Sequence, residues 1–312
     1  MSGGYTHITL AQLAIEEVRN RHEGLLHDEA KRALGKWKKF CIVGSVSPDY
    51  PYLDVLNVLD SAQSAAWADA MHKGHAVDLL RNGVAKVRDM ADANIRQKCM
   101  AWLFGFAAHV ATDGTIHPVV NLKVGPYEEH KSEHRHCEMS QDVYAHSRLN
   151  LGALEFNRQI STNIDDSSDP DDSDRMDPDI AQLWRSMLMD VYPKTDPQLH
   201  QPEIHDWHDA MRRMVKFGES GNKLFAFARH VAVNQGLVYP EEPDPEFIRG
   251  LETPLGVRMD FEEIFQKALQ NVLELWGWIA LALQNQASPL DRLVSWSLDT
   301  GIDENGNMVY WS

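Results

Sequence analysis

The sequence predicts an all-α protein, and two features of its 312 residues support this fold class. Apolar residues recur three and four positions apart in several segments, which places them on one face of an α-helix. No segment alternates between apolar and polar residues strongly enough to predict a sheet. The chain is long enough to bury a full core. At 43% hydrophobic and 24% charged residues, it has the composition of a globular protein.

Helices are predicted over most of the chain. Gly44, Pro48 and Pro51 interrupt the helical pattern early, because proline lacks the amide hydrogen that a helix interior needs. The pair Asn82-Gly83 predicts a turn after the third helix. The predicted helices span residues 9–21, 29–40, 64–80, 89–112, 128–150, 180–191, 204–217, 222–235 and 261–285.

One segment is compositionally biased. Residues 163–179 read NIDDSSDPDDSDRMDPD, with Ile164 as the only aliphatic side chain, and this predicts a flexible surface loop. The segment lacks the glycine and terminal glutamate of an EF-hand calcium loop. Near the end of the chain, Asn305-Gly306 predicts the turn of a small hairpin or arm. The expected organisation is a metal-binding catalytic core at 1–160, an acidic flexible loop at 161–179, and further helices with a C-terminal arm at 180–312, all in one continuous domain.

Charge and cysteine content narrow the classes of function. Acidic residues outnumber basic ones by 46 to 30, which disfavours nucleic acid as a partner because nucleic-acid binding depends on basic surface. Bound divalent cations would weaken that argument. The sequence shows no secretory signal and no transmembrane segment. The three cysteines lack CxxC spacing, so we expect a cytoplasmic protein without disulfides.

A row of metal-ligating side chains lies in the apolar segment that starts at residue 101. His109, Asp113 and His117 are spaced four apart and therefore share one helix face. A buried charge costs several kcal/mol unless it is paired or bound to a metal, so Asp113 needs a partner. Gly114 and Pro118 predict that this helix ends near the row.

A second row follows on the next predicted helix. His134 and Glu138 are again four apart, and Asp142 lies one turn further on. Imidazole and carboxylate groups are the ligands that hold zinc, and zinc usually takes at least three protein ligands. Two such rows that face each other predict a metal site able to hold more than one ion.

Five stretches, in this order along the chain, resemble the zinc-dependent phospholipase C family. They are YTHITLAQLA, GSVSPDYPYLD, WADAMH, FGFAAHVATDGTIH and EHRHCEMSQD. The same family includes single-strand-specific nucleases, and the catalytic part of glycosylphosphatidylinositol-specific phospholipase D is similar. The resemblance covers residues 4–145 and implies an all-helical fold that binds two or three zinc ions.

The resemblance also implies which residues hold the zinc ions. His7 would bind one ion together with Asp113, whose carboxylate would bridge to a second. Asp49, His72 and His109 would complete the second site. The third site would consist of three residues: His117, His134 and Glu138.

Further roles and one departure follow from the same resemblance. Asp49 would act on the attacking water, and Asp142 would orient ligating imidazoles. His75 is the alternative to His72 as a ligand. In secreted family members, the processed amino terminus itself binds zinc. This chain begins MSGGYT, with no signal to cleave, so the zinc at His7 is expected to be weak or missing.

These observations predict a zinc-dependent phosphoesterase. Its substrate would be a phospholipid or related phosphate ester, hydrolysed by a metal-bound hydroxide. One alternative is an HD-type metal phosphohydrolase, although its His-Asp doublets, His27-Asp28, His205-Asp206 and His208-Asp209, lie outside the apolar helix. The other is a non-enzymatic helical protein with a structural metal, in which every zinc position is filled by protein. The sequence does not predict the oligomeric state.

Overall fold

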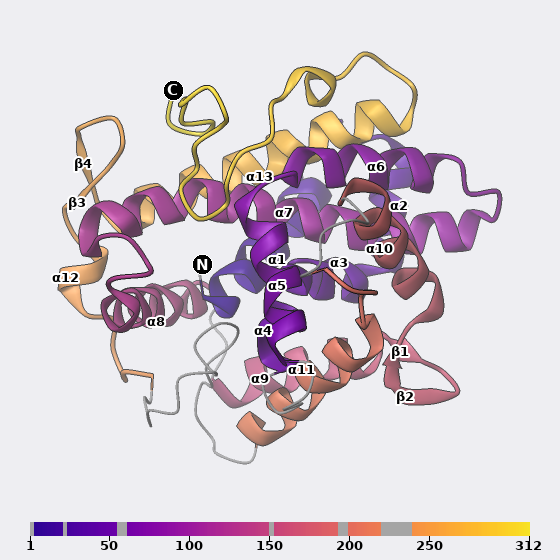
Figure 1. Ribbon diagram of the computed structural model, residues 1–312, viewed down its shortest axis with the longest axis horizontal. Coiled ribbons are helices and arrows are strands. Elements are labelled where there is room, and N and C mark those ends of the chain that lie inside the picture. Colours follow the sequence, from indigo (N-terminus) through magenta and orange to yellow (C-terminus); the bar gives the residue numbers. More distant parts are fainter. Residues whose placement is uncertain (1–2, 21–23, 55–60, 150–152, 193–198, 220–238) are drawn as a thin grey trace.

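The computed structural model describes residues 3–20, 24–54, 61–149, 153–192, 199–219 and 239–312. The predicted all-α class is confirmed (Figure 1). The helices of the first half are α1 (Gly4–Asn20), α2 (Asp28–Lys36), α3 (Lys38–Gly44), the 3-10 turn η1 (Ser47–Asp49), α4 (Tyr50–Leu53), α5 (Ser61–Lys73), α6 (Ala76–Arg88), α7 (Ala93–Val124) and α8 (Lys131–Ser147). Those that follow are α9 (Ala153–Asp165), α10 (Pro178–Val191), α11 (Ile204–Glu219), α12 (Pro245–Ile248), α13 (Phe261–Leu283) and the 3-10 turn η4 (Pro289–Arg292).

Helix α7 runs through the centre of the molecule, with α3 and α13 packed along it (Figure 1). Asp92 caps its first turn by accepting from the amides of Asn94 and Ile95. The predicted end of this helix near Gly114 and Pro118 is wrong, because α7 continues to Val124. Packing of the C-terminal residues against this turn offsets the helix-breaking tendency of its glycine and proline.

Two predicted helices in the first half are each divided. The predicted helix at 29–40 is split at Trp37, which caps both α2 and α3. The predicted helix at 64–80 is interrupted before His75, whose φ of 60° lies in the left-handed region. The turn predicted at Asn82-Gly83 is wrong, since both residues lie inside α6. Gly83 serves packing instead, because a Cβ there would lie 2.7 Å from a methyl group of Leu103.

The acidic segment forms regular structure where an irregular loop was predicted. Its first residues complete α9, and β1 (Ser168–Asp169) pairs antiparallel with β2 (Asp172–Met176). Arg212 on α11 contacts Asp165 and Asp174, and Lys98 contacts Asp177. Basic side chains distant in sequence therefore neutralise part of the acidic run. The predicted helix at 222–235 lies outside the described residues.

The last part of the chain, α13 and the C-terminal arm, packs against α7. Helix α13 begins with a capping box between Asp260 and Glu263. It follows the short sheet of β3 (Leu251–Glu252) and β4 (Arg258–Met259). The C-terminal arm, residues 293–312, turns beside Gly306 as predicted and carries two isolated β-bridges. Among the described residues, no helix is long and apolar enough to cross a membrane.

Candidate metal centre

The Asp113 carboxylate lies at the centre of four imidazoles. It is fully buried in the middle of α7. On the same helix, His109 Nε2 lies 3.2 Å from Oδ2 and His117 Nε2 lies 3.3 Å from Oδ1. From other helices, His7 Nε2 approaches Oδ1 at 3.1 Å and His72 Nε2 approaches Oδ2 at 3.6 Å. The row predicted from four-residue spacing therefore exists, and α1 and α5 add to it.

Asp49 extends this cluster on one side. Located in η1, it places Oδ1 3.3 Å from His72 Nε2. His72 Nε2 in turn lies 3.3 Å from His109 Nε2. Among the described residues, two groups of three have all ligand atoms within 4.8 Å of one another: His7, His109 and Asp113, and Asp49, His72 and His109.

His7 is buried in the first turn of α1, although the first predicted helix began only at residue 9. Helix α1 begins at Gly4, five residues earlier than the sequence pattern predicted. The imidazole of His7 stacks on that of His109, with ring centroids 4.1 Å apart and planes inclined by 11°. This stacking brings the start of the chain against the middle of α7.

Backbone carbonyls fix the proton on three of the imidazoles. A carbonyl oxygen can only accept, so the Nδ1 atom facing it carries the proton and the opposite Nε2 presents a lone pair to the cluster. His72 donates in this way to Ala68 at 2.7 Å, His109 to Ser45 at 3.0 Å and His117 to Leu298 at 2.7 Å. Sequence reasoning did not find these partners, because any residue type supplies a carbonyl.

Two glycines bring the Ser45 carbonyl within reach of His109. A Cβ at Gly44 would overlap the carbonyl oxygen of Trp102, and a Cβ at Gly105 would overlap that of Cys41. Helices α3 and α7 therefore pack backbone against backbone just before the ligand row. The glycine in LFGFAAH is a signal for this close approach that sequence reasoning overlooked.

The buried nitrogens and carboxylates of the cluster suit a divalent cation. His7 Nε2, His117 Nε2 and both oxygens of Asp49 have no hydrogen-bond partner among the described residues, although all are buried. Leaving such an atom unpaired costs about 1–3 kcal/mol. The Nε2 atoms of His72 and His109 also face each other at 3.3 Å. A cation bound between these atoms would satisfy all of them at once, so the residues fit zinc.

The protonation states also suit metal binding. Burial lowers the pKa of His7, and burial lowers that of His117 to about 4. Burial opposes ionisation of Asp113, yet the surrounding histidines hold its pKa well below the usual value. His109 and His72 likewise lower the pKa of Asp49 against the effect of burial. Both carboxylates are therefore ionised at neutral pH, while His7 and His117 present neutral imidazoles.

The predicted third set is looser. His134 Nδ1 lies 3.5 Å from Glu138 Oε1, and its Nε2 is 2.7 Å from the carbonyl of Gly125. This histidine has the opposite tautomer, with the lone pair of Nδ1 directed at the carboxylate. The charge of Glu138 raises the pKa of His117 against the larger effect of burial, so the pair lies within electrostatic range of the main cluster.

A comparison with protein families identifies the family to which this chain belongs. The family described as zinc dependent phospholipase C matches residues 6–194. The chain belongs to this family. Its members are hydrolases of phosphoester bonds, so this protein is a zinc-dependent phosphoesterase and the non-enzymatic alternative is not supported. Comparison with curated proteins and with solved structures gave no match.

The structure distinguishes His72 from its alternative. His72 is fully buried within the cluster around Asp113, whereas His75 is exposed and contacts Asp78 at 3.0 Å. The hydroxyl of Tyr52 donates to Asp69 at 2.6 Å, and Lys73 also contacts that carboxylate. His72 therefore contacts Asp113, whereas Asp69 and His75 have other partners.

Among the described residues, Asp142 is hydrogen-bonded to Thr6 and Tyr239, so its predicted role in orienting an imidazole stays a prediction without a direct contact behind it. One carboxylate oxygen accepts from the amide of Thr6 at 2.8 Å and from its hydroxyl at 2.7 Å. The other accepts from the hydroxyl of Tyr239 at 2.8 Å. Asp142 holds the first turn of α1 against α8, and this turn carries His7. Gly3 permits the contact, because a Cβ there would overlap the carboxylate.

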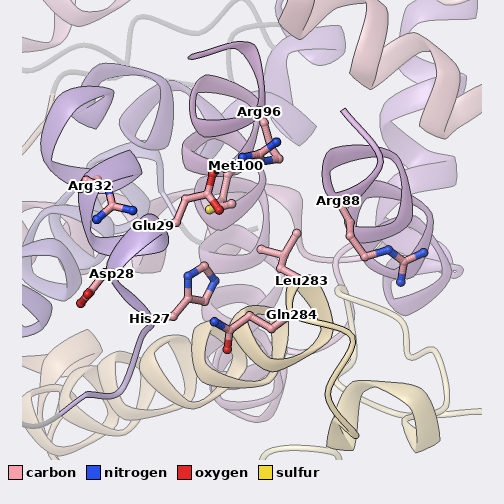
Figure 2. A pocket seen from close by; sticks show the side chains of 9 residues that line it. All are labelled: His27, Asp28, Glu29, Arg32, Arg88, Arg96, Met100, Leu283 and Gln284. Carbon is pink, nitrogen blue, oxygen red and sulfur yellow. Dashed lines mark hydrogen bonds and ion pairs between the residues drawn. The ribbon is translucent and has the colours of Figure 1, made fainter. Parts of the chain in front are cut away.

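A separate cavity of about 650 Å³ lies between α2, α6, α7 and α13 (Figure 2). Three arginines line it, but Arg96 is bound to Glu29 at 2.8 Å. None of the clustered histidines reaches this cavity. The doublet His27-Asp28 lines this cavity and does not belong to the cluster, and the HD-type alternative is not supported.

Proposed function

We propose that this enzyme hydrolyses a phosphodiester whose phosphoryl group binds at the cluster around Asp113. The observation that carries this proposal is the convergence of four imidazole Nε2 atoms on one buried carboxylate, at 3.1–3.6 Å. Three of these imidazoles have their proton held on the other nitrogen. Such a set is preorganised to bind metal before any substrate arrives.

The ligands are assigned to three zinc positions in this proposal. His7 and Asp113 would hold one ion, and Asp113 would also serve the second. Asp49, His72 and His109 would complete the second position, which agrees with their compact arrangement. The third position would use three residues: His117, His134 and Glu138. Its wider spacing leads us to expect weaker binding there than at the second position.

Each group then has a distinct chemical part. Zinc ions lower the pKa of a bound water and neutralise charge on phosphoryl oxygens. Asp49, ionised and without a hydrogen-bond partner among the described residues, is the proton acceptor for the attacking water. Its side chain is 4% exposed and that of His117 is 3% exposed, whereas Asp113 is fully covered. Substrate is therefore expected to approach between Asp49 and His117.

We propose a phospholipid or a related phosphate ester as the substrate. The formal charge of −16 opposes binding of a long polyanion such as nucleic acid, because only local cations at the site would offset it. A single phosphodiester head group carries much less charge. We therefore expect faster hydrolysis of head-group esters than of single-stranded DNA.

Replacement of the central carboxylate tests the proposal. We expect Asp113→Asn to lose bound zinc and to hydrolyse bis-p-nitrophenyl phosphate and p-nitrophenyl phosphorylcholine at least about 1,000-fold more slowly, since zinc supplies several kcal/mol of transition-state stabilisation. Asp89→Asn is the matched control, because that side chain is 71% exposed. A wild-type protein without zinc, or equal turnover in Asp113→Asn, would contradict the proposal.

A further inference from the structure

The C-terminal arm contacts two ligand-bearing helices through one residue. The carbonyl of Leu298 accepts from His117 Nδ1 at 2.7 Å, and its amide donates to the carbonyl of His72 at 2.7 Å. Leu298 is buried, with 1% of its surface exposed. Its backbone therefore joins α5 to α7 between two histidines that we assign to different zinc positions.

Further contacts hold this part of the arm on α7. Asn121 Nδ2 donates to the carbonyl of Asp299 at 2.6 Å, three residues beyond Pro118. Trp311 Nε1 donates to the carbonyl of Thr115 at 2.9 Å. The arm is therefore hydrogen-bonded to α7 on both sides of His117, at Thr115 and at Asn121. These contacts give the backbone carbonyls of Asp299 and Thr115 side-chain hydrogen-bond donors.

Gly301 lets the arm lie this close to the ligand helix. Its φ of 69° is in the left-handed region, and a Cβ there would lie 2.6 Å from Pro118 Cγ and 3.0 Å from the carbonyl oxygen of Gly114. Gly306, at the tip of the same arm, has a φ of 82°, and no atom lies within 4 Å of its would-be Cβ. The two glycines share a backbone conformation and differ in their contact with α7.

We propose that the C-terminal arm is a positioning element of the metal centre, with Leu298 fixing the tautomer and orientation of His117. This inference rests on the proposed function. The arm lies outside residues 6–194, over which the family matches. A carbonyl partner for the nitrogen opposite the metal raises the basicity of the ligand, and loss of such a partner typically weakens metal binding 10–100-fold.

The two glycines provide the test. Apo protein is titrated with zinc in competition with a chromophoric chelator, for wild type, Gly301→Ala and Gly306→Ala. Both variants carry the cost of alanine at positive φ. Only Gly301→Ala should displace the arm from His117, and we expect it to weaken one zinc ion by about 10–100-fold. Gly306→Ala should bind zinc as wild type does.

A spectroscopic measurement separates positioning from general stability. In nitrogen-15 histidine spectra of the zinc-loaded protein, the Nδ1–H signal of His117 is assigned by its loss in His117→Gln. We expect Gly301→Ala to broaden or shift this signal, while Gly306→Ala leaves it in place. Equal zinc affinity in both glycine variants, or an unchanged signal in Gly301→Ala, would overturn the proposal.

Milder variants apply if Gly301→Ala fails to fold. Trp311→Phe removes the indole donor to Thr115 together with part of the ring covered by Lys267, and Asn121→Ala removes the amide that donates to Asp299. We expect each to weaken the same zinc ion, by less than Gly301→Ala does. Wild-type affinity in both variants would overturn the role of the arm. Absence of zinc from the wild-type protein would instead contradict the proposed function.

Discussion

Two buried histidine sites in this molecule look alike in sequence and differ in chemistry. On α7, His109 and His117 flank Asp113. On α11, the segment HDWHD places His208 next to a carboxylate in the sequence, and the structure buries His208 fully. There, Nε2 lies 2.9 Å from the hydroxyl of Ser168. Both sites are buried, but of the two only the α7 site resembles a metal centre.

The difference lies in what each carboxylate contacts. Asp113 is surrounded by imidazoles, whereas Asp165 and Asp174 beside the α11 site contact Arg212 at 3.0 and 2.5 Å. An arginine neutralises those carboxylates and adds a positive charge that opposes a bound cation. A buried histidine therefore indicates a metal site only when the neighbouring carboxylate has no basic side chain to pair with.

The largest effect should separate the two sites directly. His109→Gln removes a ligand from the Asp113 cluster, so we expect loss of zinc and a fall in phosphodiesterase activity of at least about 1,000-fold. His208→Gln keeps a polar group near Ser168, so we expect full zinc content and wild-type activity with a lower melting temperature. Zinc analysis and turnover on both purified variants check this. Loss of zinc in His208→Gln would contradict the proposed difference between the α7 and α11 sites.

The next effect concerns the support of His7. Gly3→Ala inserts a methyl group where the Asp142 carboxylate lies, and this should push the first turn of α1 away from α8. We expect roughly tenfold weaker zinc binding at the His7 position, as for loss of a group that orients a ligand. Chelator competition measures it.

Gly35→Ala is the matched control for Gly3→Ala. Nothing lies within 4 Å of its would-be Cβ, and it is in the exposed part of α2. We expect unchanged zinc binding, with stability raised by about 0.5–1 kcal/mol. Similar zinc affinities in the two alanine variants would show that His7 does not depend on Asp142.

A pH effect of intermediate size should come from His208. Burial, reinforced by the charge of Arg212, lowers its pKa to about 3 from the ordinary 6.5. Below pH 6.5, His208 binds a proton in the unfolded chain but stays neutral in the folded protein. The free energy of unfolding should therefore fall as the pH falls from 6.5 towards 3. One proton corresponds to at most about 1.4 kcal/mol per pH unit.

Comparison of metal-free wild type with His208→Gln isolates this contribution. Urea unfolding at several pH values in the presence of a chelator gives the free energy of unfolding for each. We expect a shallower fall with acidification in the variant. Parallel profiles would show that His208 is not the group that titrates.

The smallest effect is expected at an exposed histidine. His75→Asn should leave zinc content and activity unchanged, because among the described residues the His75 side chain contacts Asp78 and the ring of Tyr192, away from the cluster. Asparagine also tolerates the left-handed conformation found there. His72→Asn is the paired variant and should lose zinc. If His75→Asn lost zinc instead, the assignment of ligands on α5 would be wrong.

The sequence by itself predicted the all-α class, the family and the row on α7. Four-residue spacing is a local property of a helix, so His109, Asp113 and His117 had to share a face. The order of the short motifs also pointed to His7, Asp49 and His72. The structure brings His7 and His72 to Asp113, and Asp49 to His72. Local pattern and motif order were sufficient for these residues.

Tertiary structure alone decided how the imidazoles are held. Their partners are backbone carbonyls, such as that of Leu298, which lies 181 residues from His117 in the sequence. A carbonyl has no side-chain signature, so no motif could reveal it. The continuation of α7 past Pro118 and the contact between Asp142 and Thr6 are likewise products of packing between distant segments. Sequence pattern supplies the metal-binding groups, and long-range packing sets the direction in which each presents its lone pair.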